Sequence, residues 1–221
     1  MKDLCAVVPV KPFDQAKSRL AAVLGKGQRR ALAQTMFVHV LSALARVDAI
    51  EDVIVVTADE DAAAIAHAAG VRVLKEAAAR GLNTAVEAGL SEAERLSFAR
   101  ALVLPGDLPF LDVGDIARLI AEAAPTGRPQ VSLIPAADGD GTNALMLAPP
   151  SALAPRFGRG SFLAHLTQAL ARQVDVRVHH LESFAIDIDT PADLAHLARS
   201  PDYAFLQDAS SVPERTANGA T

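Results

Sequence analysis

Short apolar runs alternate with longer amphipathic stretches along the first 135 residues, and this alternation most constrains the fold. The apolar runs have the length of buried strands, and the amphipathic stretches repeat their apolar residues with the period of a helix. The predicted strands cover residues 4–10, 53–56, 71–74, 101–104 and 130–134, and the predicted helices cover residues 28–46, 59–69, 82–95 and 113–124. Strands that alternate with helices form a parallel sheet with helices on both faces. We therefore predict a three-layer α/β fold with a mainly parallel sheet.

The pattern loosens after Ala136. We predict a turn at residues 138–141, a helix at residues 160–172, and strands at residues 143–147, 176–179 and 184–188. His179 and His180 close the second of these strands, where we expect them to face solvent. Residues 1–200 are predicted to form a single domain. Residues 201–221 end in small and polar residues, and we expect a flexible C-terminal tail there.

The composition argues against several classes of protein. Hydrophobic residues make up 51% of the 221 and the mean hydropathy is +0.23, yet no run approaches the roughly 18 apolar residues of a membrane span. A net charge of −5 argues against nucleic-acid binding, which needs a basic face. Cys5 is the only cysteine, which excludes an internal disulfide and a cysteine-based zinc site. Because the N-terminus leads straight into a predicted strand, we expect no signal peptide and a cytoplasmic protein.

Three aspartates lie where apolar segments end. Asp107 follows a predicted strand in the sequence Leu-Pro-Gly-Asp-Leu-Pro, and Asp187 and Asp189 end the last predicted strand in the sequence Ile-Asp-Ile-Asp-Thr-Pro. Open α/β sheets bind their ligands where parallel strands end, and Mg²⁺ usually takes one or two carboxylates together with substrate phosphates. The three carboxylates therefore indicate a magnesium site. As an alternative, Asp189 could cap a helix that begins near Pro191.

The loop after the first predicted strand carries cations instead of glycines. Neither a Rossmann fingerprint nor a Walker loop occurs there, but Lys11, Lys17 and Arg19 fall within nine residues that also include a proline. Cations at such a position neutralise a triphosphate and stabilise charge on the transferring phosphorus. The alternative is a solvated basic loop.

Two further segments have the residue types of ligand-binding loops. Asn83 lies at the start of a predicted helix, where its amide could meet a purine edge or could simply cap the helix. In the sequence Phe-Gly-Arg-Gly-Ser-Phe, Gly158 and Gly160 allow close approach of the backbone, and Arg159 offers a charge-assisted contact. Ser161 is expected to cap the following helix, whose N-terminus would be a ready anion site. An ordinary glycine-rich helix start is the alternative.

These segments occur together, and in the same order, in a known family. The chain carries Pro-Val-Lys at 9–11, Ala-Lys-Ser-Arg-Leu at 16–20, Leu-Pro-Gly-Asp-Leu-Pro at 104–109, Asp-Gly-Thr-Asn-Ala-Leu at 140–145, Phe-Gly-Arg-Gly-Ser-Phe at 157–162 and Asp-Ile-Asp-Thr-Pro at 187–191. This set resembles the phospholactate guanylyltransferases of deazaflavin coenzyme F-420 biosynthesis, over about residues 4–198. Those enzymes are a branch of the nucleotidyltransferases with a glycosyltransferase-A-like fold.

The resemblance implies a reaction. GTP and the phosphate of 2-phospho-L-lactate, phosphoenolpyruvate or 3-phosphoglycerate would give a guanylated diphosphate and pyrophosphate. By the resemblance Mg²⁺ would be bound by Asp107, Asp187 and Asp189. The phosphate or carboxylate of the acid would be held by Thr142, Gly158 and Ser161. Charge that develops during in-line attack on the α-phosphorus would be neutralised by Mg²⁺ and by Lys11, Lys17 and Arg19.

Other functions stay open at this point. Another nucleotidyltransferase of the same fold could act on molybdopterin or a sugar phosphate, although the glycine-free first loop counts against both. A glycosyltransferase would fit the Asp-x-Asp element, but that element normally follows a middle strand. A catalytically inactive nucleotide-binding protein is a further alternative, which clustered carboxylates disfavour because they repel one another without a metal.

The apolar composition permits a homodimer. By the resemblance, the product would pass to the next enzyme of the F-420 pathway.

Overall fold

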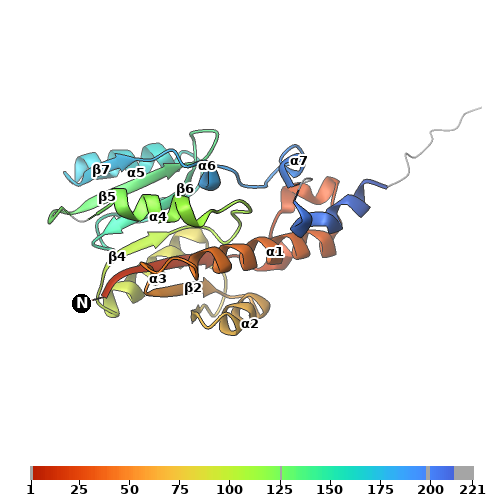
Figure 1. Ribbon diagram of the computed structural model, residues 1–221, viewed down its shortest axis with the longest axis horizontal. Helices are drawn as coiled ribbons and strands as arrows, with labels where there is room; N and C mark the ends of the chain where they lie inside the picture. Colours follow the sequence, from red (N-terminus) through yellow and green to blue (C-terminus); the bar gives the residue numbers. More distant parts are fainter. Residues whose placement is uncertain (1, 125, 198–199, 212–221) are drawn as a thin grey trace, which may run out of the picture.

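The predicted strands and helices form one sheet covered by helices on both faces (Figure 1). The computed structural model describes residues 2–124, 126–197 and 200–211, of which residues 207–211 are described by their backbone alone. The strands are β1 (Lys2–Val10), β2 (Asp52–Thr57), β3 (Arg72–Lys75), β4 (Phe98–Val103), β5 (Gln130–Pro135), β6 (Thr142–Ala148) and β7 (Asp175–Val178). The α-helices are α1 (Lys26–Leu44), α2 (Glu60–Ala68), α3 (Leu82–Arg95), α4 (Val113–Glu122), α5 (Ser161–Ala171), α6 (Glu182–Ala185) and α7 (Leu194–Leu197). Three 3₁₀ segments are η1 (Phe13–Gln15), η2 (Ser18–Ala22) and η3 (Pro201–Ser211).

The sheet has the order β3-β2-β1-β4-β6-β5-β7. Among the described strands β6 alone runs against the others, because it pairs antiparallel with both β4 and β5 while the remaining pairs are parallel. An antiparallel strand begins at the edge where its neighbours end. The start of β6 at Thr142 therefore lies at the same edge as the residues that follow β1 and β4, which include Lys11 and Asp107.

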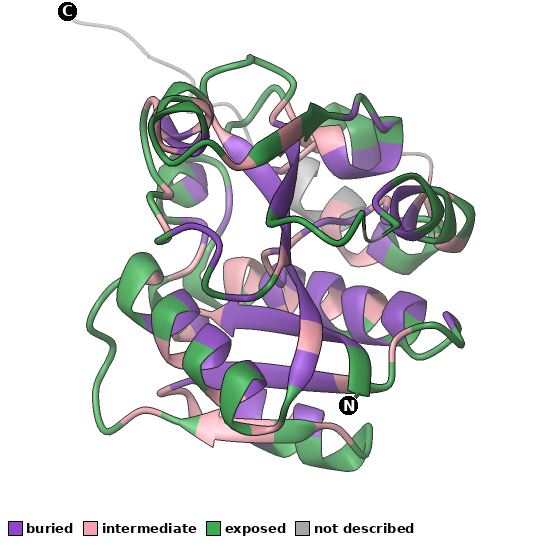
Figure 2. Cartoon of the chain, turned by 90° about the vertical axis from the view of Figure 1, so that its left-hand side faces the viewer, coloured by how far each residue is buried: buried purple, intermediate pink, exposed green. Residues whose placement is uncertain are grey.

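The strands inside the sheet are buried on both faces, since alternate side chains point to opposite sides of the sheet and both sides are covered, whereas the edge strands β3 and β7 are largely exposed. Leu4, Ala6 and Val8 of β1 pack into a core with α1, α2 and α4, whereas Cys5 and Val7 pack into a second core with α3 and α5. Figure 2 shows the buried strands between helices whose outer faces are exposed. The predicted three-layer, mainly parallel α/β fold is confirmed. Within the described residues, none of the helices combines the length and the apolar character needed to cross a membrane.

A third apolar cluster lies beyond the edge where most strands end. It joins η2, α1, α7 and η3 through buried side chains that include Leu20, Met36, Ile188 and Tyr203. Figure 1 shows α7 and η3 at one end of the molecule, beyond the sheet, beside the end of α1 that projects past the strands. The cluster holds the segment around Ile188 against the segment around Leu20, although the two are far apart in the sequence.

The predicted strand at residues 184–188 is wrong. The chain forms the short helix α6 and then runs without regular structure past Ile188. The carbonyl oxygens of Phe184 and Ala185 accept hydrogen bonds from the Asn143 amide at 2.8 and 3.1 Å, and that of Ala185 also accepts one from the Ala137 N–H at 3.1 Å. A side chain and a loop therefore satisfy this backbone, in place of a neighbouring strand.

Two smaller predictions also need correction. Tyr203 is buried in the third cluster and Leu206 packs against it, so a flexible tail does not begin at residue 201; residues 212–221 lie outside the described residues. His179 is buried instead of facing solvent, and both its ring nitrogens have partners: one contacts Glu122 Oε2 at 2.9 Å and the other contacts Ser132 Oγ at 3.0 Å. His180 is exposed, as predicted.

Gly89 allows α3 to pack closely on β1, which yields a test of the fold. A Cβ at this position would overlap the Cγ1 methyl of Val7 and lie 3.1 Å from Cγ2 of Val56. We expect Gly89→Ala to lower the free energy of unfolding by about 1–3 kcal/mol, the usual effect of overpacking, reduced by the better helix propensity of alanine. Gly27→Ala in α1 is the control, because a Cβ there would meet no atom within 4 Å. Equal denaturation midpoints for the two variants would contradict this packing.

Candidate active site

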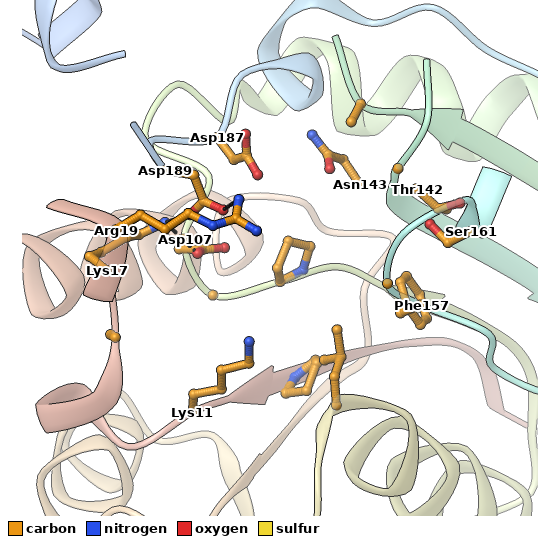
Figure 3. A pocket seen from close by; sticks show the side chains of 18 of the residues that line it. Lys11, Lys17, Arg19, Asp107, Thr142, Asn143, Phe157, Ser161, Asp187 and Asp189 are labelled. Carbon is orange, nitrogen blue, oxygen red and sulfur yellow. Dashed lines mark hydrogen bonds and ion pairs between the residues drawn. The ribbon is translucent and has the colours of Figure 1, made fainter. Parts of the chain in front are cut away.

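A cavity of about 970 Å³ opens at the edge of the sheet where β1 and β4 end and β6 begins (Figure 3). Every predicted site residue except Asn83 lines it. One wall carries charged side chains, those of Lys11, Lys17, Arg19, Asp107, Asp187 and Asp189. Another wall carries the predicted acid-binding residues Thr142, Gly158, Arg159 and Ser161. The fold thus brings together residues from five separate segments of the chain.

Lys17 is the centre of the charged wall. Its ammonium lies 2.7 Å from Asp107 Oδ2 and 3.3 Å from Asp189 Oδ1, and its side chain is only 2% exposed. Burial opposes the charged form, but the carboxylates of Asp107 and Asp189 outweigh it and raise the pKa of Lys17 above its usual value. Lys17 also has φ 53° and ψ 36°, a left-handed conformation that residues with a side chain rarely adopt. Such local strain is typical of functional sites.

The two other cations of this wall are less constrained. Arg19 is 74% exposed and contacts Asp189 Oδ2 at 3.2 Å. Lys11 follows β1, and its ammonium points into the cavity (Figure 3). Both side chains are free to rearrange around an anionic ligand, because neither is buried in the core. The prediction that all three cations bind phosphates stays a prediction.

Asp187 is the third carboxylate of this wall. Burial, together with the negative charges of Asp189 and Asp107, raises the pKa of Asp187 above its usual value. Ile188, fully buried in the third cluster, anchors the chain between Asp187 and Asp189. The three carboxylates therefore lie close enough to repel one another.

These residues fit a divalent cation in part. Their oxygens are the hard ligands that Mg²⁺ prefers, and the Lys17 ammonium already lies as a cation between Asp107 and Asp189. No three His, Cys, Asp or Glu side chains among the described residues are arranged to hold a metal ion. Two carboxylates with substrate phosphates suffice for Mg²⁺ in many enzymes. The cation prediction thus agrees with the donor set and stays a prediction.

The alternative role of Asp189 as a helix cap does not agree with the structure. Its carboxylate contacts Lys17 and Arg19. Asp193 instead accepts hydrogen bonds from the backbone N–H groups of Asp189 and Thr190, at 3.0 and 2.6 Å. Asp193 therefore shapes the turn before α7 and leaves the Asp189 carboxylate directed at the cavity.

The N-terminus of α5 is already satisfied within the protein, which corrects one expectation. The N–H of Gly160 donates to Asp140 Oδ2 at 2.9 Å, and that of Phe162 donates to the Asp140 carbonyl at 3.1 Å. Gly160 is the cap residue, with φ 68°, and Ser161 is the first helical residue instead of the cap. Asp140 thus supplies the anion at this helix end. A bound acid would rely on the side chains of Ser161, Thr142 and Arg159 and on the backbone of Gly158, which all line the cavity, and this binding stays a prediction.

Asn83 connects α3 to the loop before α5. Its amide donates to the Phe157 carbonyl at 3.0 Å and accepts from the Phe157 N–H at 2.7 Å. The alternative role as a helix cap is wrong, because Gly81 caps α3. Base recognition stays a prediction and would have to use the remaining hydrogen-bonding capacity of the amide.

Sequence reasoning missed three residues around the cavity. Asn143 binds the backbone just before Asp187, Asp140 caps α5, and His165 contacts Thr142 Oγ1 through Nδ1 at 3.1 Å. His165 lies one helical turn after Ser161, so it shares that residue's face of α5. This spacing was the available signal for His165. Asn143 and Asp140 lie in the Asp-Gly-Thr-Asn-Ala-Leu segment of the family resemblance, but that segment does not show their partners, which are more than ten residues away.

The fold and the cavity define the class of protein. The chain matches a crystal structure assigned to a nucleotide-diphospho-sugar transferase from Desulfovibrio desulfuricans G20, with a TM-score of 0.75 over 95% of this chain and 96% of that chain. Sequence identity is 18%, so this likeness shows the fold alone. The protein has the nucleotide-diphospho-sugar transferase-like fold of the nucleotidyltransferases, which confirms the predicted fold class.

The family follows from the sequence matches. Residues 4–200 match the family described as "Guanylyl transferase CofC like", and the chain belongs to this family. The chain is 40% identical over 189 residues to the phosphoenolpyruvate guanylyltransferase of Conexibacter woesei, and the alignment covers 86% of this chain and 84% of that protein. The predicted guanylyltransferase activity and family resemblance are thereby confirmed.

Two other relatives are named for different acids. The 3-phospho-D-glycerate guanylyltransferase of Phenylobacterium zucineum is 37% identical over 201 residues, covering 89% of this chain and 90% of that protein. The 2-phospho-L-lactate guanylyltransferase of Methanothermobacter thermautotrophicus is 35% identical over 193 residues, covering 87% and 83%. The relatives thus share guanylyl transfer and differ in the acid for which they are named.

Proposed function

We propose that the protein transfers GMP from GTP to the phosphate of a small three-carbon acid, with Mg²⁺ as cofactor, in the biosynthesis of the deazaflavin coenzyme F-420. The candidate acids are phosphoenolpyruvate, 2-phospho-L-lactate and 3-phosphoglycerate, for which the relatives are named. The observation that supports this proposal is the cavity with two different walls. One wall carries cations and carboxylates suited to a triphosphate, and the other carries hydroxyls suited to a small anion.

The charged wall would hold the nucleotide phosphates. Lys11 and Arg19 can reach bound phosphates because both line the cavity and neither is buried. Asp107 and Asp189, with Asp187 beside them, would hold Mg²⁺, which when bound neutralises phosphate charge. Lys17 would then leave its place between the two carboxylates and turn its ammonium toward the phosphates. The buried ammonium thus keeps the carboxylates paired until substrate arrives.

The chemistry that follows is a single displacement. A phosphate oxygen of the acid attacks the α-phosphorus of GTP, and the bond from that phosphorus to the oxygen bridging to the β-phosphate breaks. Pyrophosphate leaves with the electron pair of that bond, and the guanylated acid diphosphate remains. A phosphate dianion has no proton to lose, so the site needs no general base. The residues contribute by positioning the two substrates and neutralising charge.

We also propose where the reaction takes place. Cys5, the only cysteine, is buried and free, which suits a reducing cytoplasm. We place the protein there and expect its product to pass to the next enzyme of the F-420 pathway. A homodimer stays a prediction.

The acceptor is tested by rates of pyrophosphate release. The protein would be supplied with GTP, Mg²⁺ and one acceptor at a time, including a sugar phosphate as the control. We expect fast release with one of the three acids and none with the sugar phosphate. Release with the sugar phosphate alone would favour a sugar-phosphate nucleotidyltransferase and contradict the proposed acceptor.

The acid-binding wall is tested by Ser161→Ala. Ser161 lines the cavity and is 1% exposed. We expect the KM for the acid to rise about ten- to a hundredfold, because one hydrogen bond to a charged ligand contributes roughly 1.5–3 kcal/mol. The KM for GTP should stay unchanged.

The control for this prediction is Ser91→Ala, an exposed position in α3 on another part of the surface. Melting temperatures of both variants separate an effect on folding from an effect on binding. A raised KM for GTP with an unchanged KM for the acid would place Ser161 in the nucleotide site and reverse the assignment.

A further inference from the structure

A buried chain of hydrogen bonds lies behind the acid-binding wall. The backbone N–H of Arg156 lies 2.9 Å from His165 Nε2, and His165 Nδ1 lies 3.1 Å from Thr142 Oγ1. His165 is fully buried and does not line the cavity, whereas Thr142 does. His165 therefore reaches the cavity by hydrogen bonding through Thr142, without lining it.

The Arg156 N–H fixes the tautomer of His165. A backbone N–H only donates, so the Nε2 atom that faces it must be the unprotonated, accepting nitrogen. Burial, supported by the charge of Arg156 and opposed by a weaker contact with the Ser161 backbone, lowers the pKa of His165 to about 4. The ring is therefore neutral near pH 7, and its one N–H proton sits on Nδ1. The edge of the Phe157 ring, whose centroid lies 5.1 Å from that of His165, helps to hold the imidazole in place.

This tautomer decides what Thr142 offers to a ligand. Because Nδ1 carries the proton, it donates to Thr142 Oγ1, and the threonine hydroxyl acts toward His165 as an acceptor. The hydroxyl proton of Thr142 is then free to point into the cavity. In the opposite tautomer, Thr142 would donate its proton to the ring and would present only lone pairs to the cavity, which an anion would avoid.

We infer that His165 is a positioning residue that fixes Thr142 as a hydrogen-bond donor and thereby selects an unprotonated oxygen of a carboxylate or phosphate group at this wall. The inference rests on the proposed function, because it assumes that the acid binds next to Thr142. Hydrogen bonds that run in one direction polarise one another, so the chain from Arg156 through His165 strengthens the last donor. Histidines that bind metals show the same principle: a hydrogen bond to one ring nitrogen sets the tautomer and so decides what the other nitrogen offers.

The first test is a double-mutant cycle on the KM for the acid. Thr142→Val removes the hydroxyl at nearly equal volume and should raise this KM about ten- to a hundredfold. His165→Phe keeps a ring but removes both nitrogens and should raise it about three- to tenfold, because the hydroxyl loses its orientation. The KM for GTP should stay unchanged in both variants. The double variant should be no worse than Thr142→Val, since His165 acts only through that hydroxyl.

Rescue separates positioning from packing. His165→Asn places an amide near the former Nδ1 and can donate to Thr142, so it should bring the KM for the acid to within about threefold of the unchanged protein. Fold-changes that multiply in the double variant would overturn the inference. Equal increases in the KM values for acid and GTP would overturn it as well, because a merely structural role moves both.

The second test does not depend on turnover. Nitrogen-15 NMR of the histidine-labelled protein near pH 7 distinguishes the two neutral tautomers by the chemical shifts of the ring nitrogens. We expect the His165 proton on Nδ1, and a proton on Nε2 would overturn the inference even if the enzyme is fully active. If no acid supports turnover while Nδ1 is protonated, the proposed function fails and the assigned orientation of Thr142 stands.

Discussion

Asp107→Asn, and separately Asp189→Asn, is expected to lower kcat by at least about a hundredfold, which corresponds to roughly 3 kcal/mol of lost transition-state stabilisation. The melting temperature should stay near that of the unchanged protein. The two carboxylates are 38% and 39% exposed and contact Lys17. They face the cavity and are not packed in the core, so losing their charge should affect the site more than the fold. Asparagine keeps their size, and each single change leaves the buried ammonium with one carboxylate as its partner.

Binding of a divalent ion gives a readout for these variants that is independent of turnover. Calorimetric titration with Mn²⁺ in the presence of GTP should show weaker binding to both variants. Asp48→Asn is the control, because Asp48 is exposed and does not line the cavity. Near-normal kcat for both Asp107→Asn and Asp189→Asn at saturating Mg²⁺ would contradict the proposed metal site.

Lys17→Met is expected to lower kcat roughly 10²–10³-fold and to raise the KM for GTP, because the ammonium would contact phosphates in both the ground state and the transition state. Methionine keeps an unbranched apolar stem in the buried position and removes the charge. A second effect follows from the ion pairs. Mn²⁺ should bind more tightly in the absence of nucleotide, because the ammonium no longer lies between Asp107 and Asp189.

The control for the lysine is Lys26→Met at the start of α1, where the side chain is 67% exposed and pairs with Asp14 at 3.0 Å. This variant also loses one positive charge but should keep its kinetics and its affinity for Mn²⁺. If Lys17→Met only loses stability while kcat, KM and Mn²⁺ affinity stay the same, then Lys17 is a structural ion-pair partner and has no part in catalysis.

Much of the fold was predictable because its signals are local. The helix predicted at residues 82–95 is α3, whose bounds are Leu82–Arg95, since its apolar face repeats with the helical period over its whole length. The edge where parallel strands end also located the site in advance. Asp107 follows β4 and Lys11 follows β1, and neighbouring parallel strands carry both to the same cavity.

The remaining features depend on partners that are distant in the sequence. The apolar run that ends at Ile188 resembled a strand, and Ile188 is fully buried, as a strand residue would be. It packs in the third cluster and not in the sheet, and an apolar run does not reveal which surface will cover it. The ion pairs of Lys17 span 90 and 172 residues. Asp140 caps a helix that begins 21 residues later, so the α5 N-terminus looked free in the sequence and is not.

The most direct test of guanylyl transfer is to identify the products by phosphorus-31 NMR after incubation of the protein with GTP, Mg²⁺ and one acid at a time. With the physiological acid we expect equal amounts of pyrophosphate and of a guanylated diphosphate whose two phosphorus signals are coupled. Without an acid, GTP should remain intact. Unchanged GTP with phosphoenolpyruvate, 2-phospho-L-lactate and 3-phosphoglycerate alike, or its conversion to GDP and inorganic phosphate, would contradict the proposed reaction.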